Sequence, residues 1–391
     1  MTSSRKTPLY QEHVGAGARM ADFHGWSTPI FFSSILEESK SVRENVGMFD
    51  ISHMGEVEVK GEHAFALLQN LTSNDLRAIE QGQAQYTTLL NEDGGILDDL
   101  LVYKISEERF FLCLNASNTE SDVNWIADQA LQYPDVEVRN LSRHYGMISI
   151  QGPNSESLLK LLTRCDLSKI GYYHFVVTVV GGHSVILSRT GYTGEDGFEI
   201  FCEWRETGSL WKQARARGKS FGLKLIGLGA RDILRLEMGY PLYGADIGPD
   251  ITPYEAGLGW IVKMDKPGGF AGYAALEKQK EEGIKRTLVG IEMIGRGIPR
   301  AGYPILSGGV KVGEVTSGSM SPTLGKAIGL GYAPPELAEA GTPLFIDIRG
   351  KMASAVVKPK PFVSARVKKP ALPEQGERES LILTRSDREE K

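Results

Sequence analysis

The sequence of 391 residues predicts an α+β fold with mainly antiparallel sheets and an all-β domain toward its C-terminal end. Strand-like and helix-like segments alternate through the first two thirds of the chain. An Asp-Gly turn joins two apolar runs, which is typical of an antiparallel hairpin. From about Lys285 to Val363, apolar runs are separated by glycine, proline and serine, which favours a small barrel or jelly roll.

After an irregular start, the first predicted elements are a short strand and a helix. Val57 and Val59 alternate with charged residues, as in a strand with one buried face. Four apolar residues then follow a spacing of three and four, which predicts an amphipathic helix: Ala64, Leu67, Leu68 and Leu71. This strand and helix begin the α+β pattern.

A hairpin, a strand and a second helix follow. The hairpin runs from Tyr86 to Lys104 and turns at residues 92–95. An apolar strand covers 110–114, and Ser117 and Glu120 have the spacing of a capping box at the start of the next helix. That helix carries an apolar face of five residues: Val123, Ile126, Ala127, Ala130 and Leu131.

The stretch from Met147 to Tyr243 repeats the mixture of strands and helices. Residues 147–150 are apolar, Pro153 stands where a helix can begin, and residues 209–217 have a helical pattern. In the C-terminal part, strands are predicted over 288–291, 310–315 and 344–348. Residues 307–309 are predicted to form a hairpin loop. Beyond Pro370 the chain is charged and poor in aromatic residues, which predicts a disordered tail over 370–391.

Composition excludes several classes of protein. The net charge of −5 and the lack of a basic face argue against nucleic-acid binding. No apolar stretch approaches the length of a membrane span, and the first ten residues lack the apolar core of a signal peptide. The cysteines, Cys113, Cys165 and Cys202, lie far apart without metal-ligand spacing. We therefore expect a cytoplasmic protein without a metal and without a membrane partner.

Common catalytic signatures are incomplete. Gly227-Leu228-Gly229 begins a dinucleotide fingerprint, but Asp232 stands where the third glycine should be. No phosphate-binding GxxxxGK[ST] loop is present. His53 lies in one short segment with a serine and an aspartate, too close in sequence to build a spatial triad. A structural histidine is the better interpretation there.

Two adjacent acids stand out in the predicted hairpin. Asp98 and Asp99 must point to opposite faces of their strand, and each lies in a row of apolar residues. An unpaired carboxylate in an apolar row is costly, so at least one should meet a polar ligand or a polar network. Two surface acids beside a turn explain the pattern equally well, and the strand pattern alone leaves both interpretations open.

A second candidate region lies between Gly191 and Asp232. Three glycines at intervals of three precede Glu199 and let the backbone approach a flat ligand. Glu199 could accept two hydrogen bonds from the edge of a heterocycle, although a turn acid in a salt bridge is slightly favoured. Arg231 could bind a ligand as a planar fork or pair locally with Asp232.

Taken together, several motifs in a fixed order resemble the T-protein, or aminomethyltransferase, family of the glycine cleavage system. The resemblance runs from Thr7 to about Val363, which is nearly the whole chain. Each motif is weak alone, but their order and spacing are highly specific. The motifs are Asp22-Phe-His-Gly-Trp26, Gly47-Met-Phe-Asp-Ile-Ser-His-Met54, Gly94-Gly-Ile-Leu-Asp-Asp-Leu100, Arg189-Thr-Gly-Tyr-Thr-Gly-Glu-Asp-Gly-Phe-Glu199, Gly227 to Asp232, Thr316-Ser-Gly318 and Ser321-Pro-Thr-Leu-Gly325.

The resemblance implies a three-domain cloverleaf around a central channel for tetrahydrofolate. We expect a first α+β domain from 1–50 plus 145–260 and a second from 51–144, which carries the Asp98-Asp99 hairpin. The C-terminal β-barrel domain is expected over 285–365. The donor would be the aminomethyl group on the lipoyl arm of H-protein, and the products would be 5,10-methylenetetrahydrofolate, ammonia and the dihydrolipoyl arm.

The resemblance also assigns candidate site residues. Asp99 matches the family's catalytic aspartate, and seven further positions match the folate pocket: Tyr86, Tyr103, Asn115, Tyr173, Tyr192, Glu199 and Arg231. The C-terminal end departs from the family, because members commonly end soon after the segment that matches 361–363. Arg366 is our candidate for the last folate contact.

Two alternative functions remain at this point. One is a related tetrahydrofolate-dependent demethylase. The other is a non-catalytic folate-binding module that assists iron–sulfur assembly. Such modules typically carry a Lys-Gly-Cys-Tyr signature, whereas the corresponding region here, Met238 to Gly244, has no cysteine. That difference favours an enzyme.

Overall fold

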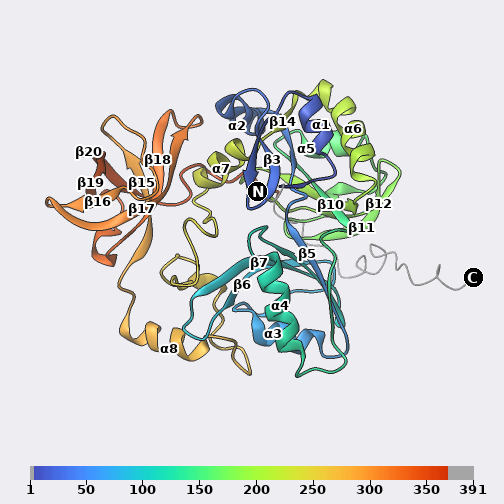
Figure 1. Cartoon of the computed structure of the whole chain (residues 1–391), viewed down its shortest axis with the longest axis horizontal. Helices are drawn as coiled ribbons and strands as arrows, with labels where there is room; N and C mark the ends of the chain where they lie inside the picture. The colour runs from blue at the N-terminus through green and yellow to red at the C-terminus, as the bar shows by residue number, and fades with distance from the viewer. Residues whose placement is uncertain (1–3, 369–391) are drawn as a thin grey trace, which may run out of the picture.

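The computed structural model describes residues 4–368 and has three lobes (Figure 1). Two lobes combine helices with sheets, and the third is a closed barrel at the left of the view. The predicted α+β class with a C-terminal β-barrel is confirmed. The predicted disordered tail, 370–391, lies outside the described residues. No helix within 4–368 is long and apolar enough to cross a membrane.

The first lobe is built on a six-stranded sheet. All neighbouring strands are antiparallel except β4 and β14, which are parallel. In sheet order the strands are β11 (Phe175–Val180), β12 (His183–Ser188), β13 (Gly197–Glu203), β10 (Tyr145–Gln151), β4 (Val46–Asp50) and β14 (Leu223–Ile226). Apolar residues of α5 (Ser155–Leu159) and α6 (Thr207–Gly218), among them Leu158 and Trp211, pack on one face of this sheet.

The N-terminal residues add a small sheet and two helices to this lobe. The elements are β1 (Arg5–Lys6), α1 (Tyr10–Gly15), β2 (Arg19–Phe23), β3 (Trp26–Phe31) and α2 (Ile35–Glu44). We expected an irregular start, and that expectation was wrong. The buried side of α2 includes Glu38 and Arg43, whose polar groups are hydrogen-bonded inside the protein. A helix buried through charged side chains has no apolar period to detect.

The second lobe is an antiparallel five-stranded sheet covered by two helices on one face. In sheet order the strands are β6 (Ala84–Leu90), β7 (Ile96–Ser106), β8 (Arg109–Leu114), β5 (Gly55–Lys60) and β9 (Glu137–Asn140). The helices are α3 (Ala64–Leu71) and α4 (Thr119–Ala130). The predicted hairpin is confirmed as β6 and β7. The capping box is wrong, because α4 begins one residue later, after Asn118, which makes no side-chain capping hydrogen bond.

A long connection leads from α7 (Leu228–Glu237) to the barrel and packs on the tip of the β6–β7 hairpin. Its apolar residues surround Leu90 and Ile96: Ile247, Ala256, Leu258, Ile261, Val262, Phe270 and Leu276. A Cβ on Gly95 would lie 1.8 Å from the Pro249 carbonyl oxygen, so only glycine allows this approach. We expected residues up to 260 to belong to the first lobe, yet these contacts place 247–262 on the second. The connection ends in α8 (Tyr273–Glu282).

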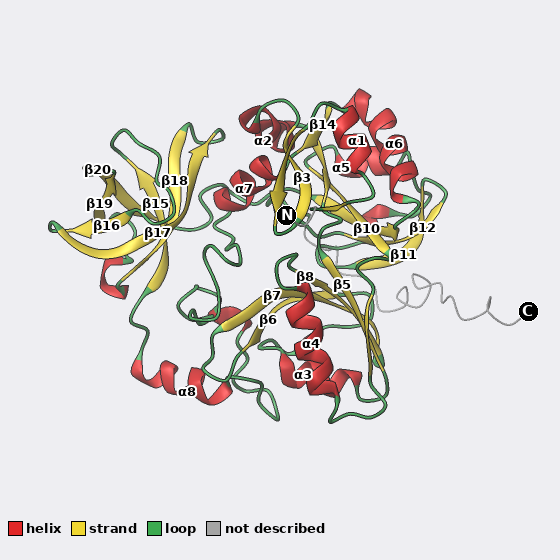
Figure 2. Ribbon diagram, viewed as in Figure 1, coloured by secondary structure: helices red, strands yellow, loops and turns green. Residues whose placement is uncertain are grey.

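The third lobe is a closed six-stranded barrel (Figure 2). In barrel order the strands are β15 (Thr287–Met293), β18 (Lys326–Ala333), β17 (Val310–Ser321), β16 (Pro304–Ser307), β19 (Pro343–Ile348) and β20 (Lys351–Lys358). The predicted loop at 307–309 joins β16 to β17 as a hairpin. An apolar core that includes Ile291, Ile305 and Ile346 fills the barrel.

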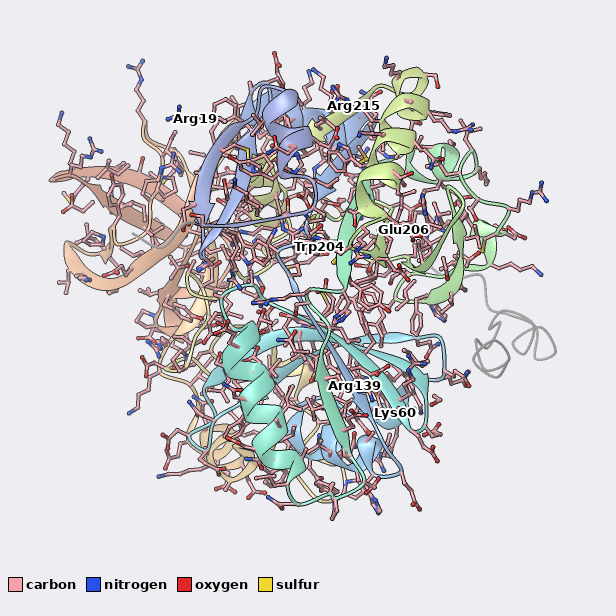
Figure 3. The ribbon with its side chains drawn as sticks, turned by 45° about the vertical axis from the view of Figure 1, so that its right-hand side comes forward. Arg19, Lys60, Arg139, Trp204, Glu206 and Arg215 are labelled. Atoms are coloured by element: carbon pink, nitrogen blue, oxygen red, sulfur yellow. The ribbon has the colours of Figure 1, made fainter. Side chains whose placement is uncertain are left out.

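The two α+β lobes share a buried core between their sheets. Phe49 and Phe201 of the first lobe pack with Tyr103, Phe111 and neighbouring apolar residues of the second. Figure 3 shows the two lobes one above the other, with Trp204 on the upper lobe, and Lys60 and Arg139 on the lower one. The shared core fixes the two sheets relative to each other.

A buried ionic network, which we call the Arg43 network, joins the first lobe to the barrel. The Arg43 guanidinium donates to Glu237 Oε2 at 2.7 Å and to Glu195 Oε1 at 2.8 Å. Ser321 at the end of β17 donates to Glu237 Oε1 at 2.6 Å, and Arg366 donates to Glu195 Oε1 at 2.6 Å. The network therefore ties α2, α7, the barrel and the C-terminal segment together.

Candidate active site

A cavity of about 810 Å³ lies between the first two lobes. Its walls include residues of both sheets, of α7 and of the connection that follows α7. Lys360 and Pro361, after the last barrel strand, also line it. A volume of several hundred Å³ in a partly enclosed space is typical of a site for a cofactor-sized ligand.

The predicted site residues gather at this cavity, with two exceptions. Those that line it are Tyr86, Asp99, Asn115, Tyr173, Tyr192, Glu199 and Arg231. The exceptions are Tyr103 and Arg366. Residues from strands β6, β7 and β13, from α7 and from the loops between them are thus brought to one space, although they span nearly 150 positions of the sequence.

Asp99 lines the cavity and is held by two donors. Tyr86 Oη donates to Asp99 Oδ2 at 2.8 Å, and Asn115 Nδ2 donates to Asp99 Oδ1 at 2.8 Å. Asp98 points to the opposite face of β7, where its fully buried carboxyl group accepts a hydrogen bond from Asn118 Nδ2 at 2.7 Å. The alternation of the strand therefore sends Asp99 into the cavity and Asp98 into a polar network.

The environment of Asp99 favours its protonated form. Burial is the largest cause, and the neighbouring carboxyl group of Asp98 adds to it, so the pKa of Asp99 is raised to about 7. The hydrogen bonds from Tyr86 and Asn115 oppose this rise, because they stabilise the carboxylate. A carboxyl group with a pKa near 7 can both release and accept a proton at neutral pH.

Glu199 lies on β13 at a different part of the cavity wall. Thr190 Oγ1 donates to Glu199 Oε2 at 2.6 Å. No residue within 4–368 donates a hydrogen bond to the second oxygen, Oε1. Burial raises the pKa of Glu199, while Thr190 and the positive charge of Arg231 lower it. One oxygen of a buried carboxyl group is thus available to a ligand.

Arg231 presents its guanidinium to the same space. Its Cζ atom lies 4.9 Å from the centre of the Tyr192 ring, as in a cation–π contact. No carboxylate of the described chain forms an ion pair with it, although Asp232 is its neighbour in sequence. Asp232 pairs with Arg235 at 2.7 Å instead. The planar donors of Arg231 are therefore free to meet a ligand.

Aromatic side chains supply flat walls between these polar groups. Tyr192 stacks on Tyr240 with ring centroids 5.7 Å apart, and its hydroxyl donates to the Pro241 carbonyl. Tyr86 stacks on Trp260 at 6.1 Å, and Trp260 is 61% exposed at the cavity. Flat aromatic rings in the wall of a cavity suit a planar ligand.

Tyr103, which was expected in the pocket from motif position, and Arg366, the candidate for the last folate contact, both lie outside the cavity lining. Tyr103 is fully buried, and its ring makes edge contacts with Phe111, Phe175 and Phe201 in the core between the sheets. Arg366 belongs to the Arg43 network, where it pairs with Glu195. The C-terminal segment reaches the cavity at Lys360 and Pro361 instead.

His53 is a cavity residue that the sequence interpretation missed. It is 3% exposed and lines the cavity, and its Nδ1 has no hydrogen-bond partner among the described residues. Burial and the charge of Arg231 lower the pKa of His53 to about 4, so the ring is neutral at pH 7. The short sequence motif that His53 shares with Asp50 did not indicate that His53 lines a cavity. In the structure Asp50 pairs with His13 instead.

Comparisons with known proteins agree with this architecture. The family model described as the GCVT N-terminal domain matches residues 9–266, and the glycine cleavage T-protein C-terminal barrel domain matches 286–364. An aminomethyltransferase of Desulfitobacterium hafniense (strain DSM 10664 / DCB-2) is 48% identical over 362 residues, which cover 93% of this chain and 99% of the relative. One from Bacillus cereus (strain B4264) is 47% identical, over 93% of this chain and 99% of the relative.

A solved structure gives the same result. The glycine cleavage system aminomethyltransferase T from Bartonella henselae superposes with a TM-score of 0.88 at 34% sequence identity. The match covers 94% of this chain and all of that one. With family models that match both the α+β lobes and the barrel, the chain belongs to the glycine cleavage T-protein family of aminomethyltransferases.

Proposed function

We propose that the protein transfers the carbon of an aminomethyl group to tetrahydrofolate bound in the cavity. The donor is the aminomethyl thioether on the lipoyl arm of H-protein, and the products are 5,10-methylenetetrahydrofolate, ammonia and the dihydrolipoyl arm. The observation that carries the proposal is a cavity that joins Asp99 and Glu199, in a chain whose relatives are named aminomethyltransferase. Those names do not favour a demethylase or a non-catalytic module.

The transfer moves two protons. The N5 and N10 nitrogens of tetrahydrofolate each lose a hydrogen as they bond the carbon, and the sulfur and the departing amine each gain one. An acid–base group with a pKa near the working pH serves such a reaction. Asp99 has this property, because burial and Asp98 raise its pKa to about 7. As a carboxylate, Asp99 also stabilises the positive charge that develops on the carbon while the carbon–sulfur bond breaks.

Glu199 and Arg231 position the folate. The pterin ring has adjacent N–H donors on its pyrimidine edge, and the available oxygen of Glu199 is suited to accept from them. Arg231 donates to the acceptors of the ring, and Tyr173 and Tyr192 provide flat walls beside it. Holding the folate nitrogens near the incoming carbon provides much of the rate enhancement, since the nucleophile belongs to the substrate.

The partner and the compartment follow from this function. Lipoylated H-protein supplies the one-carbon unit, so the lipoyl arm must enter the cavity. We place the protein in the cytoplasm, where thiols stay reduced. The free thiols of Cys113, Cys165 and Cys202 are consistent with that placement.

The decisive assay is tetrahydrofolate-dependent ammonia release from aminomethyl-loaded H-protein. We expect ammonia and 5,10-methylenetetrahydrofolate in equal amounts, and a background rate when folate is omitted. Intact folate binding without ammonia release would overturn the proposal. The demethylase alternative would then be tested with N-methylated small molecules as donors.

A further inference from the structure

A third carboxyl group lies behind the two acids of the hairpin. Asp122, on the first turn of α4, is 3% exposed and meets Asp98 at hydrogen-bonding distance. Asp98 also accepts from Asn115 N at 3.1 Å, from Asn115 Nδ2 at 2.8 Å and from Asn118 Nδ2 at 2.7 Å. The same Asn115 amide bonds Asp99. Asp122, Asp98, Asn115 and Asp99 thus form a continuous chain that ends in the cavity.

Two buried carboxyl groups in contact must share a proton. Two carboxylates would offer only acceptors to each other, and their charges would repel in a space with little water. No lysine, arginine or histidine of the described chain forms an ion pair with either group. One of the two is therefore protonated at neutral pH.

The donors decide which group holds the proton. Asp98 receives N–H bonds from Asn115 and Asn118, and such bonds stabilise a carboxylate. No residue within 4–368 donates an N–H bond to the carboxyl group of Asp122, whose Oδ2 is buried. The proton belongs on Asp122, which then donates to Asp98. Burial and the charges of Asp98 and Asp99 raise the pKa of Asp122 to about 10, in agreement.

We propose that Asp122 is a positioning residue that keeps a proton between itself and Asp98, and so holds Asp98 as the anion that orients Asn115 and sets the charge beside Asp99. This inference rests on the proposed role of Asp99 for its catalytic meaning. The groups that face this chain from other elements are tyrosines: Tyr243 beside Asp122, and Tyr86, Tyr173 and Tyr192 beside Asp99. None of them carries a charge at neutral pH.

The test is carboxyl ¹³C NMR of the full chain with labelled aspartate, titrated from pH 5 to pH 9. In the unmodified protein, Asp122 should keep the shift of a protonated acid through pH 8, and Asp99 should titrate near pH 7. Asp122→Asn still donates to Asp98 and should leave the Asp99 midpoint in place. Asp122→Ala removes the donor, so Asp98 protonates more readily and the Asp99 midpoint should fall by about one pH unit.

The outcomes separate the possibilities. An Asp122 signal that titrates below pH 6 in the unmodified protein overturns the inference, and this needs no variant to fold. Equal shifts of the Asp99 midpoint in Asp122→Asn and Asp122→Ala would mean that Asp122 is ionised, which also overturns it. Unchanged midpoints in both would leave Asp122 a merely structural residue and would contradict the inference as well.

Glu56→Gln is the matched control. Glu56 is also a fully buried carboxyl group, and neither of its carboxyl oxygens has a hydrogen-bond partner in the described part of the chain. It lies opposite Cys113 rather than in the chain to Asp99. Its replacement should leave the Asp99 and Asp122 signals unchanged. The NMR midpoints are measured without H-protein, so failure of the proposed transfer would appear in the ammonia assay and not in this experiment. Where transfer is active, the acid limb of its pH–rate profile should move with the Asp99 midpoint.

Discussion

Two carboxyl groups that line the same cavity have neighbours of opposite charge. Asp99 accepts a hydrogen bond from Tyr86, and Glu199 accepts one from Thr190, so each is held by a hydroxyl group. Burial raises the pKa of both. The charge nearby differs: the carboxyl group of Asp98 pushes the pKa of Asp99 further up, whereas the guanidinium of Arg231 counteracts the rise for Glu199.

In the proposed function, this difference separates chemistry from binding within one pocket. A carboxyl group beside another acid exchanges a proton near neutral pH, while one beside a cation favours its ionised form and accepts hydrogen bonds. Burial alone would treat both groups alike. In the proposed function, the sign of the neighbouring charge therefore favours proton transfer at Asp99 and recognition of the ligand at Glu199.

The largest expected effect is at Asp99. Asp99→Asn keeps the shape and loses the titrating proton, so we expect the rate of ammonia release to fall by about 10²- to 10⁴-fold while folate binding persists. Steady-state kinetics and folate titration followed by tryptophan fluorescence measure the two quantities. Asp93→Asn, in the exposed turn of the same hairpin, is the control. Near-normal transfer by Asp99→Asn would show that the assignment of the chemistry is wrong.

The next largest effect is expected at Glu199, and it concerns folate affinity rather than the rate of transfer. Glu199→Gln removes a charged acceptor, and a hydrogen bond to a charged group contributes roughly 1.5 to 3 kcal/mol. We expect folate affinity to fall about 10- to 100-fold, with the rate at saturating folate largely retained. Glu203→Gln, at the exposed end of the same strand, should bind folate normally. A variant that binds folate well but transfers slowly would reverse the roles of the two carboxyl groups.

A smaller effect is expected at Tyr86, and it tests how the neighbours of Asp99 set the pKa of its carboxyl group. Its hydroxyl stabilises the carboxylate of Asp99, so Tyr86→Phe should raise the pKa of Asp99 further above about 7. The acid limb of the pH–rate profile should then move to higher pH by up to about one unit. A shift toward lower pH would contradict this reasoning.

Tyr86→Phe should also change how stability depends on pH. The folded-state pKa of Asp99 lies above its ordinary value of 3.8, so the folded protein holds this proton more tightly than the unfolded chain. The free energy of unfolding therefore falls as pH rises from about 4 to about 7. Removal of the Tyr86 hydroxyl should extend that fall to higher pH. Tyr133→Phe is the control, because the Tyr133 hydroxyl accepts a hydrogen bond from Asn70 outside the cavity.

The smallest effect is expected at Arg366. Its side chain is 52% exposed and pairs with Glu195, so Arg366→Ala should lower the free energy of unfolding by less than about 1 kcal/mol. Folate affinity should stay within about twofold of the unmodified protein, since Arg366 does not line the cavity. Denaturant unfolding and folate titration check both statements. A tenfold loss of affinity would return Arg366 to the binding site.

The local part of this architecture could be predicted from the sequence. Strand alternation placed Asp98 and Asp99 on opposite faces of the hairpin, and the structure has them there. Alternation says nothing about where along the strand a cavity ends. Tyr103 shares the face of Asp99 but lies four residues further on, about 13 Å along a strand, inside the core between the sheets.

The missed residues depend on contacts between distant segments. His53 could be interpreted only through its sequence neighbours, whereas its position follows from Phe23 and Arg231, which other segments bring to it. Arg366 was a candidate at a point where the chain departs from the family and no family position could be matched. Helix α2 escaped prediction because its buried face is held by Glu38 and Arg43 rather than by apolar side chains.

The Arg43 network has a consequence for the cooperativity of unfolding. One guanidinium binds Glu237 and Glu195, and through these two residues it engages the barrel at Ser321 and the C-terminal segment at Arg366. Loss of the barrel would take the Ser321 hydroxyl from the buried carboxylate of Glu237, and a buried acceptor left unsatisfied is destabilising. The lobes therefore cannot melt independently at low cost. A ligand in the cavity that binds only the folded state raises the melting temperature of the barrel as well, although no barrel strand touches it.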